Sequence, residues 1–93
     1  MRIEFDPTKS EKNVRERGLP FSLVEEFEWE TSETEIDARF PYPEERRVTF
    51  GLIGKRLHVV CHTPIEGGIR VISFRKANAR ELRKYEEKKT ADR

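Results

Sequence analysis

Residues 46–75 consist of three segments, rich in β-branched and apolar side chains, that are separated by two short turns. The segments are residues 46–53, 56–63 and 69–75, and the turns are Gly54 with Lys55 and the run from Pro64 to Gly68. Short turns of this composition predict an antiparallel meander. A chain built around a meander must bury the apolar side chains of its helices against the faces of that sheet.

A short strand and a helix are predicted at the start of the chain. Residues 2–5 alternate polar and apolar side chains, which favours a half-buried strand. Asp6 followed by Pro7 is typical of a helix start, and Gly18 is typical of a helix end. The first helix is therefore expected to run to about residue 17, with Val14 as the one apolar residue that it buries.

A second helix is expected after Pro20, because apolar residues recur there at a spacing of three and face the core: Phe21, Val24 and Phe27, with Leu23 beside them. Residues 25–45 are acidic and contain two prolines, which favours a short strand around residues 28–36 followed by an irregular loop.

Residues 77–88 are rich in good helix formers, and four of them fall on one sheet-facing stripe: Ala77, Glu81, Leu82 and Tyr85. The whole chain is then a single domain, residues 1–93, of the α+β class. We expect a small antiparallel sheet with helices packed on it, in the order β-α-α-β-β-β-β-α.

Composition excludes several classes of protein. Only 34% of the 93 residues are apolar and 40% are charged, so the core is thin and the surface highly charged. No apolar run reaches the roughly 18 residues of a membrane span, and the first residues do not resemble a signal peptide, which favours the cytoplasm. Cys61 is the only cysteine, and the common metal and nucleotide motifs are absent, so no cofactor or metal is expected.

Charge is divided unevenly along the chain. Residues 1–45 carry 6 basic and 13 acidic side chains, whereas residues 46–89 carry 12 basic and 4 acidic ones. This division predicts an anionic ligand, such as a nucleic acid, on the basic part of the surface. The candidate cations stand at strand ends and at the start of the last helix: Arg46, Arg47, Arg56, Arg70, Arg75, Lys76 and Arg80. Their alternative role is that of ordinary solvated surface charges.

Cleavage of RNA without a metal requires a base, an acid and a cation that stabilises the charge on the phosphorus. Arg75, beside Lys76, is the candidate cation because its planar fork matches two phosphate oxygens. Glu81, Tyr85 and His62 are the candidates for proton transfer. Each has a structural alternative, since Glu81 can pair with Arg75, Tyr85 can fill the core, and His62 can form a hydrogen bond within the sheet.

An ordered set of residues along nearly the whole chain resembles the BrnT family of toxins. It comprises Asp6, Pro7, Lys9, Asn13 and Gly18, then Arg46, Gly51 and Gly54, and finally residues 70–85, RVISFRKANARELRKY. The most specific part is the pattern I-S-x-R-x-A-x-x-x-E-x-x-x-Y, formed here by Ile72, Ser73, Arg75, Ala77, Glu81 and Tyr85.

This resemblance implies a RelE-like α+β ribonuclease that is neutralised by a BrnA-type antitoxin, itself a DNA-binding protein, in a hetero-oligomer. It implies that Arg46, Arg75, Glu81 and Tyr85 belong to the site, and Lys9 joins the expected RNA contacts. The sequence departs from the family at Glu16 and Arg17, where Lys-His is usual, and at Phe74, where a small residue is commoner. Phe74 is expected to narrow the cleft beside Arg75.

The main hypothesis is therefore a metal-independent endoribonuclease that uses 2′-hydroxyl attack. Arg75 and Arg46 bind the phosphate, and Glu81, Tyr85 or His62 transfers protons. Two alternatives stay open. The first is a nucleic-acid-binding module without catalysis, and the second is a protein-interaction subunit whose acidic residues 25–45 engage a basic partner.

Overall fold

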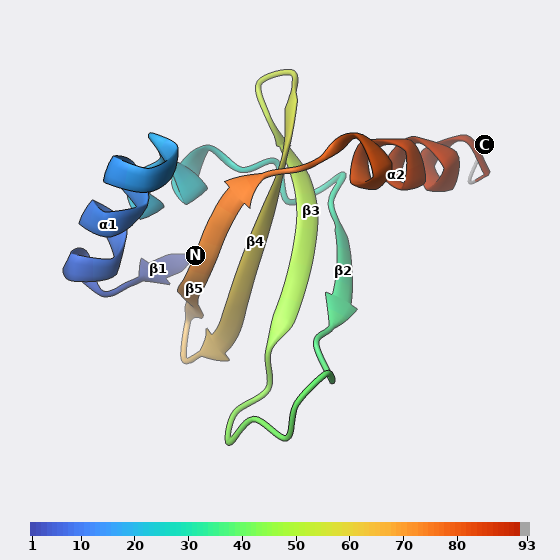
Figure 1. Cartoon of the computed structure of the whole chain (residues 1–93). Coiled ribbons are helices and arrows are strands. Elements are labelled where there is room, and N and C mark those ends of the chain that lie inside the picture. Colours follow the sequence, from blue (N-terminus) through green and yellow to red (C-terminus); the bar gives the residue numbers. More distant parts are fainter. Residues whose placement is uncertain (92–93) are drawn as a thin grey trace.

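The computed structural model describes residues 1–91 and has an α+β fold, which confirms the predicted class (Figure 1). Every predicted element is present. The elements are β1 (Arg2–Glu4), α1 (Pro7–Arg17), η1 (Phe21–Glu26), β2 (Glu33–Ile36), β3 (Arg47–Ile53), β4 (Arg56–Ile65), β5 (Gly68–Lys76) and α2 (Ala79–Ala91). No helix within residues 1–91 is long and apolar enough to cross a membrane.

The five strands form one sheet in the order β1-β5-β4-β3-β2. Strands β2 to β5 are antiparallel neighbours, as the short turns predict, but β1 pairs in parallel with β5. Strands β1 and β2 lie at opposite edges of the sheet, and α1 and η1 connect them. Gly68 permits the parallel pairing, since a Cβ there would lie 1.8 Å from the carbonyl oxygen of Arg2.

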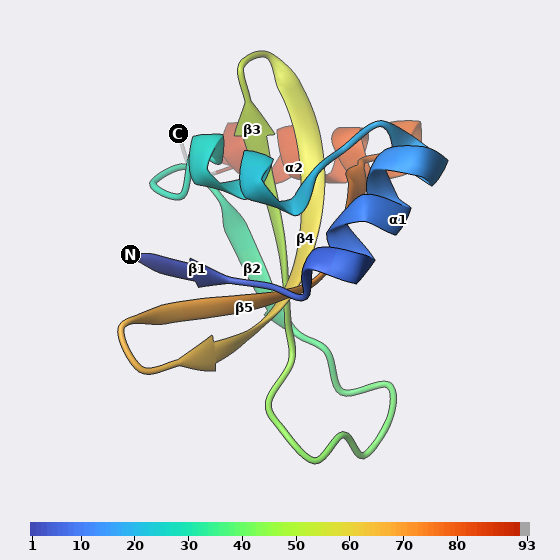
Figure 2. The same ribbon diagram turned by 90° about the vertical axis from the view of Figure 1, so that its left-hand side faces the viewer.

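Apolar side chains are buried on both faces of the sheet. Alternation along β4 sends Val60 to the face covered by α1 and η1, and Val59 to the face covered by α2. Figure 2 shows α1 and η1 in front of the strands and α2 behind them. We call these the η1 core and the α2 core. The η1 core is the larger, and it contains Val24, Val60 and Phe74 among its least exposed residues.

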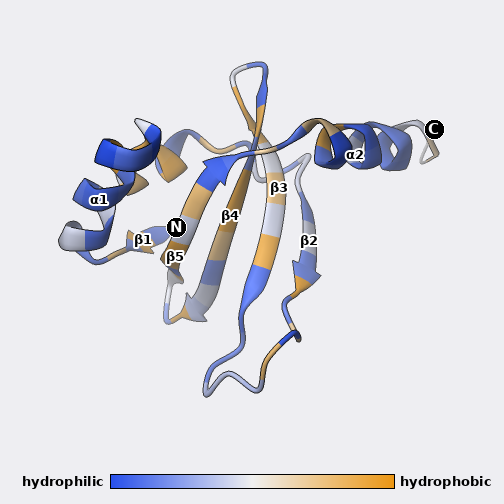
Figure 3. Ribbon diagram, viewed as in Figure 1, coloured by the Kyte–Doolittle hydropathy of each residue, from blue (hydrophilic) through white to orange (hydrophobic). Residues whose placement is uncertain are grey.

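The second predicted helix is a 3₁₀ helix, η1, rather than an α-helix. A 3₁₀ helix has three residues per turn, so the spacing of three places the apolar residues on one side. Their predicted burial is confirmed for Phe21, Val24 and Phe27. The ring of Phe27 lies directly over Gly51 of β3, where a Cβ would come within 2.4 Å of it. Figure 3 shows hydrophobic residues concentrated on η1 and the strands, whereas α1 and α2 are largely hydrophilic.

Three further details of the sequence prediction are wrong. The strand expected around residues 28–36 begins only at Glu33, because a turn closed by the Ser32 N–H and the Trp29 carbonyl comes first. Val14 is 45% exposed, since α1 turns inward through Ser10, which accepts a hydrogen bond from Phe21 of η1, and Asn13, which donates one to Phe74 of β5. Leu82 is 41% exposed, because α2 touches the sheet through Tyr85.

Candidate functional site

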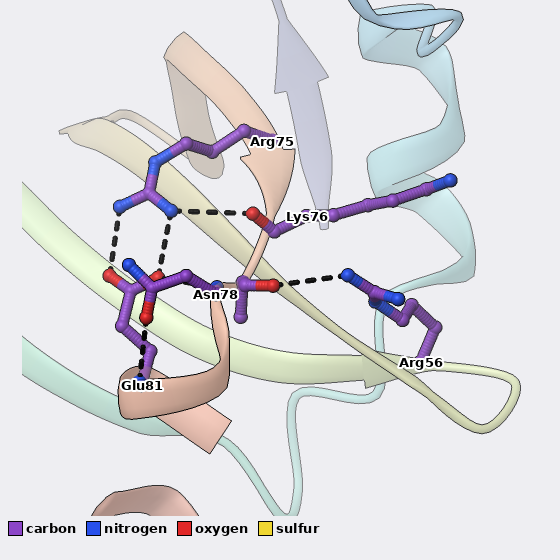
Figure 4. Close-up of polar contacts among 6 residues, drawn as sticks. Arg56, Arg75, Lys76, Asn78 and Glu81 are labelled. Atoms are coloured by element: carbon purple, nitrogen blue, oxygen red, sulfur yellow. Dashed lines mark hydrogen bonds and ion pairs between the residues drawn. The ribbon is translucent and has the colours of Figure 1, made fainter. Parts of the chain in front are cut away.

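A guanidinium–carboxylate pair joins the end of β5 to the first turn of α2. Arg75 donates from Nη1 to Oε1 of Glu81 and from Nη2 to Oε2, both at 2.8 Å (Figure 4). The hydrogen bond from Arg75 lowers the pKa of Glu81, and the same contact raises the pKa of Arg75. The Arg75 side chain is nevertheless 38% exposed, so part of its guanidinium faces solvent.

The carboxylate of Glu81 is held a second time by the cap of its own helix. The N–H of Glu81 donates to Oδ1 of Asn78, and the N–H of Asn78 donates back to Oε1 of Glu81. This reciprocal cap explains why α2 begins at Ala79 rather than at the predicted residue 77. Sequence reasoning missed Asn78, although the Asn-x-x-Glu spacing was the signal for it. Arg75 is thus oriented by a carboxylate that is itself fixed to the backbone.

Three cations on the elements around this junction, at the end of β5, the start of β4 and the start of α2, remain available to a ligand. Arg56 donates from Nη2 to the carbonyl of Ala77, and Lys76 projects away from Glu81 (Figure 4). Arg80 is exposed on α2. Within the described part of the chain, none of the three forms an ion pair. The cationic surface is therefore centred on the junction of β5 and α2.

Most other cations of the basic half are neutralised by the acidic half or by neighbours. The ion pairs are Arg70 with Glu4, Arg46 with Glu44, Arg47 with Glu45, Lys84 and Lys88 with Glu35, and Lys89 with Glu33. The charge asymmetry of the sequence therefore does not persist as two separate surfaces. Three of these contacts instead hold α2 against β2.

Arg46 lies on the same sheet face as Arg75 but at a distance from it. Arg75 pairs across to Val59 and, through it, to Phe50, and Arg46 precedes Phe50 by four residues, roughly 13 Å along a strand. Its guanidinium lies 3.9 Å from the ring centroid of Tyr42. The hydrogen bond that Arg46 donates to Glu44 raises the pKa of Arg46. Arg46 and Arg75 can thus contact only different parts of an extended ligand.

Tyr85 lines a groove beside the Arg75–Glu81 pair. Its side chain belongs to the α2 core, and its hydroxyl donates to the carbonyl of Thr31 at 2.9 Å. The groove, which we call the α2 groove, has a volume of about 200 Å³ between α2 and strands β2 and β3. It is lined by Glu33, Glu35, Phe50, Arg80, Glu81, Lys84, Tyr85 and Lys88.

Both histidines lie on the opposite face, in the η1 core. His62 is 4% exposed, shares a 2.8 Å hydrogen bond between its Nε2 and Oγ1 of Thr49, and packs edge-on against Trp29. Its Nδ1 has no hydrogen-bond partner among residues 1–91. Burial lowers the pKa of His62 to about 4 and also lowers that of His58. The face with the histidines, which looked less apolar in the sequence, is the better buried one.

This burial makes the stability of the protein depend on pH. His62 binds a proton below pH 6.5 in the unfolded chain but only near pH 4 in the folded one, so stability is complete above pH 6.5 and is lost as the pH falls towards 4. Between pH 7 and pH 5 the free energy of unfolding is expected to fall by about 2 kcal/mol on this account. Urea unfolding of the wild type and of His62→Gln at both pH values measures it, and equal losses in the two proteins would contradict a neutral buried His62.

The remaining predicted residues lie away from the pair. Lys9 is exposed on α1, on the other side of the sheet, and Arg70 pairs with Glu4 near the β1 edge. Phe74 is 1% exposed and points into the η1 core, away from Arg75, so the expectation that it narrows a cleft beside Arg75 is wrong. Burial raises the pKa of the Cys61 thiol. Residues 1–91 contain no group of three or more His, Cys, Asp or Glu side chains placed to hold a metal ion.

This fold and site define a small protein with an oriented, partly exposed guanidinium among free cations, an arrangement suited to binding a phosphodiester. The chain belongs to the BrnT family of ribonuclease toxins of type II toxin-antitoxin systems, whose family model matches residues 5–81. The match confirms the family resemblance and implies an RNA substrate and an antitoxin partner. It includes Arg75 and Glu81 and ends before Tyr85. No curated protein and no solved structure shows significant similarity to the chain, and likeness to the RelE fold stays a prediction.

Proposed function

We propose that the protein is a metal-independent endoribonuclease in which Arg75 binds the scissile phosphate of RNA. The observation that carries this proposal is the geometry of Arg75, whose guanidinium is fixed by two hydrogen bonds to Glu81 yet remains partly open to solvent. A guanidinium oriented before substrate arrives stabilises developing phosphate charge without reorganisation during the reaction.

Arg75 has donor capacity left for the phosphate. Its contacts with Glu81 and with the carbonyl of Lys76 use three hydrogen bonds, fewer than the N–H groups that a guanidinium carries. Lys76, Arg80 and Arg56 attract the RNA backbone to the same end of the sheet. Arg46 contacts the RNA further along the same face, while Lys9, Arg47 and Arg70 assist at most in its electrostatic attraction.

Glu81 accepts the proton of the attacking 2′-hydroxyl in this proposal. Its Oε2 accepts one hydrogen bond, from Arg75, and a carboxylate oxygen has room for another. A phosphate bound at Arg75 brings negative charge and competes for the guanidinium, which raises the pKa of Glu81 and makes it a stronger base. Tyr85 shapes the α2 groove, and His62, buried on the other face, takes no part.

The reaction forms a bond between the 2′-oxygen and phosphorus and breaks the bond between phosphorus and the 5′-oxygen. The 2′-hydroxyl proton passes to Glu81, and the leaving 5′-oxygen takes up a proton from water. The products are a 2′,3′-cyclic phosphate and a 5′-hydroxyl end. We further propose that a BrnA-type, DNA-binding antitoxin neutralises the toxin in the cytoplasm by forming a hetero-oligomer that covers the surface around Arg75.

Incubation of purified protein with RNA in excess EDTA tests this proposal. We expect cleavage at an unchanged rate compared with magnesium-containing buffer, and product ends that carry a cyclic phosphate. Binding that weakens steeply with salt but never leads to cleavage would favour the non-catalytic nucleic-acid-binding module. Failure to bind or cut RNA in either buffer would favour the protein-interaction subunit.

A further inference from the structure

We infer that the α2 groove binds one unpaired nucleobase of the RNA, namely the base of the nucleotide whose 2′-hydroxyl attacks, and that it prefers guanine. This inference rests on the proposed ribonuclease function and names the substrate determinant of the same site.

The groove adjoins the Arg75–Glu81 pair on the same face of the sheet. Glu81 belongs to both, and Phe50 in the groove lies two strands from Arg75 in the same cross-strand row, about 10 Å at ordinary strand spacing. In Figure 1 the chain leads from the end of β5 past β3 to α2, which lies beside the end of β2. The residues that line the groove come from α2 and from strands β2 and β3. A phosphate held at Arg75 therefore places the attached sugar at Glu81 and its base over Phe50.

The size and lining of the groove suit one planar ring system. Its volume of about 200 Å³ is below the roughly 300–1,000 Å³ of pockets that enclose drug-sized ligands. Its walls include the aromatic rings of Phe50 and Tyr85, and unpaired RNA bases stack on such rings. The hydroxyl of Tyr85 is bonded to Thr31, which fixes the ring as a rigid wall.

The polar rim of the groove indicates which base fits best. Glu35 contributes a carboxylate whose ion pairs with Lys84 and Lys88 both involve Oε1, at 3.7 and 3.9 Å. These contacts are longer than a hydrogen bond, so the carboxylate keeps the capacity to accept hydrogen bonds from a base while it remains paired with the two lysines. A carboxylate only accepts, and guanine offers adjacent N–H donors on its Watson–Crick edge, whereas uracil offers one.

Oligonucleotides of DNA that contain a single ribonucleotide test the inference, because only one 2′-hydroxyl can then attack. The ribonucleotide carries guanine, adenine, cytosine, uracil or no base. We expect the guanine substrate to be cut fastest and the abasic one roughly five- to a hundred-fold more slowly in kcat/KM, the loss that stacking of one base represents. Equal rates for all five substrates would overturn the inference.

Phe50→Leu separates stacking from packing, because leucine keeps an apolar side chain but has no ring. The variant is expected to lose most of the difference between the guanine and abasic substrates, and Glu35→Gln to lose the preference for guanine. Leu52→Ala is the matched control, since Leu52 packs on the same α2 core but lies outside the groove, and it should keep the wild-type preference. Thermal melting of each variant checks that it is folded.

The outcomes distinguish this inference from the proposed function. Cleavage that depends on Arg75 but shows the same base preference in Phe50→Leu leaves the proposed function standing and overturns the inference. A variant that loses binding of the antitoxin but not base preference identifies the groove as a protein-docking surface and also overturns it. Cleavage that does not depend on Arg75 overturns both.

Discussion

Replacing Arg75 with alanine is expected to lower kcat/KM for RNA cleavage by about a hundred- to a thousand-fold, the usual effect of removing one preorganised charge-stabilising donor. The guanidinium is held in place before substrate binds by two 2.8 Å hydrogen bonds that it donates to Glu81, so no other side chain substitutes for its geometry. Arg75→Lys should recover only part of the loss, because an ammonium cannot form a bidentate contact. Initial rates on a single-ribonucleotide substrate provide the measurement.

Arg83→Ala is the matched control for this experiment. Arg83 lies on α2, the helix that carries Glu81, and is exposed, so its removal changes net charge equally without touching the Arg75–Glu81 pair. Glu81→Gln should lower kcat more than it changes KM, since glutamine retains an acceptor for Arg75 but cannot take up the 2′-hydroxyl proton. Equal losses in Arg75→Ala and Arg83→Ala would show that Arg75 contributes only to electrostatic attraction, and the proposed mechanism would then be wrong.

Replacing Phe74 with alanine is expected to cost about 3–5 kcal/mol of stability. Phe74 is among the largest fully buried side chains, and its ring stacks on His58 within the η1 core, so its removal leaves a cavity that surrounding residues cannot fill. A small domain has only about 5–15 kcal/mol of stability in total, so the variant should be near the limit of folding at 37 °C. Urea unfolding at 25 °C measures the loss.

Val14→Ala is the control for Phe74→Ala. The sequence pattern predicts that Val14 lies on the buried side of α1, but the residue is 45% exposed. Its truncation should therefore lower the free energy of unfolding by less than about 0.5 kcal/mol. At temperatures where Phe74→Ala remains folded, its RNA cleavage should match that of the wild type, because Phe74 and Arg75 point to opposite faces. A selective loss of cleavage without loss of stability would contradict this placement.

Several parts of the fold were predictable because the interactions that determine them are local. The cap at Asp6, the left-handed Gly18 and the three-residue spacing of Phe21, Val24 and Phe27 each act within a few residues, and each is present as predicted. The meander was predictable for the same reason, since its turns are short. The parallel pairing of β1 with β5 was not, because it joins Ile3 to Ile69 and depends on Gly68.

The candidate site likewise has a part that was predictable from local sequence and a part that was not. Arg75 and Glu81 were singled out from the sequence, and their pairing followed from the cost of placing a carboxylate against the sheet. Local pattern did not reveal which cations remain free, because the partners of Lys84 and Lys88 lie about fifty residues away on β2. Nor did it reveal Phe50, whose place in the α2 groove depends on where α2 lies relative to β2 and β3.

By itself, the sequence determined the family, the element order and the identity of the Arg75–Glu81 pair, since all three depend on short-range patterns. Only the tertiary structure decided which face of the sheet each side chain occupies and which distant residues it contacts. It placed the histidines in the larger core, neutralised much of the basic half and left unpaired cations around the junction of β5 and α2. The physical reason is that burial and ion pairing depend on distances through space, which the spacing of residues along the chain does not encode.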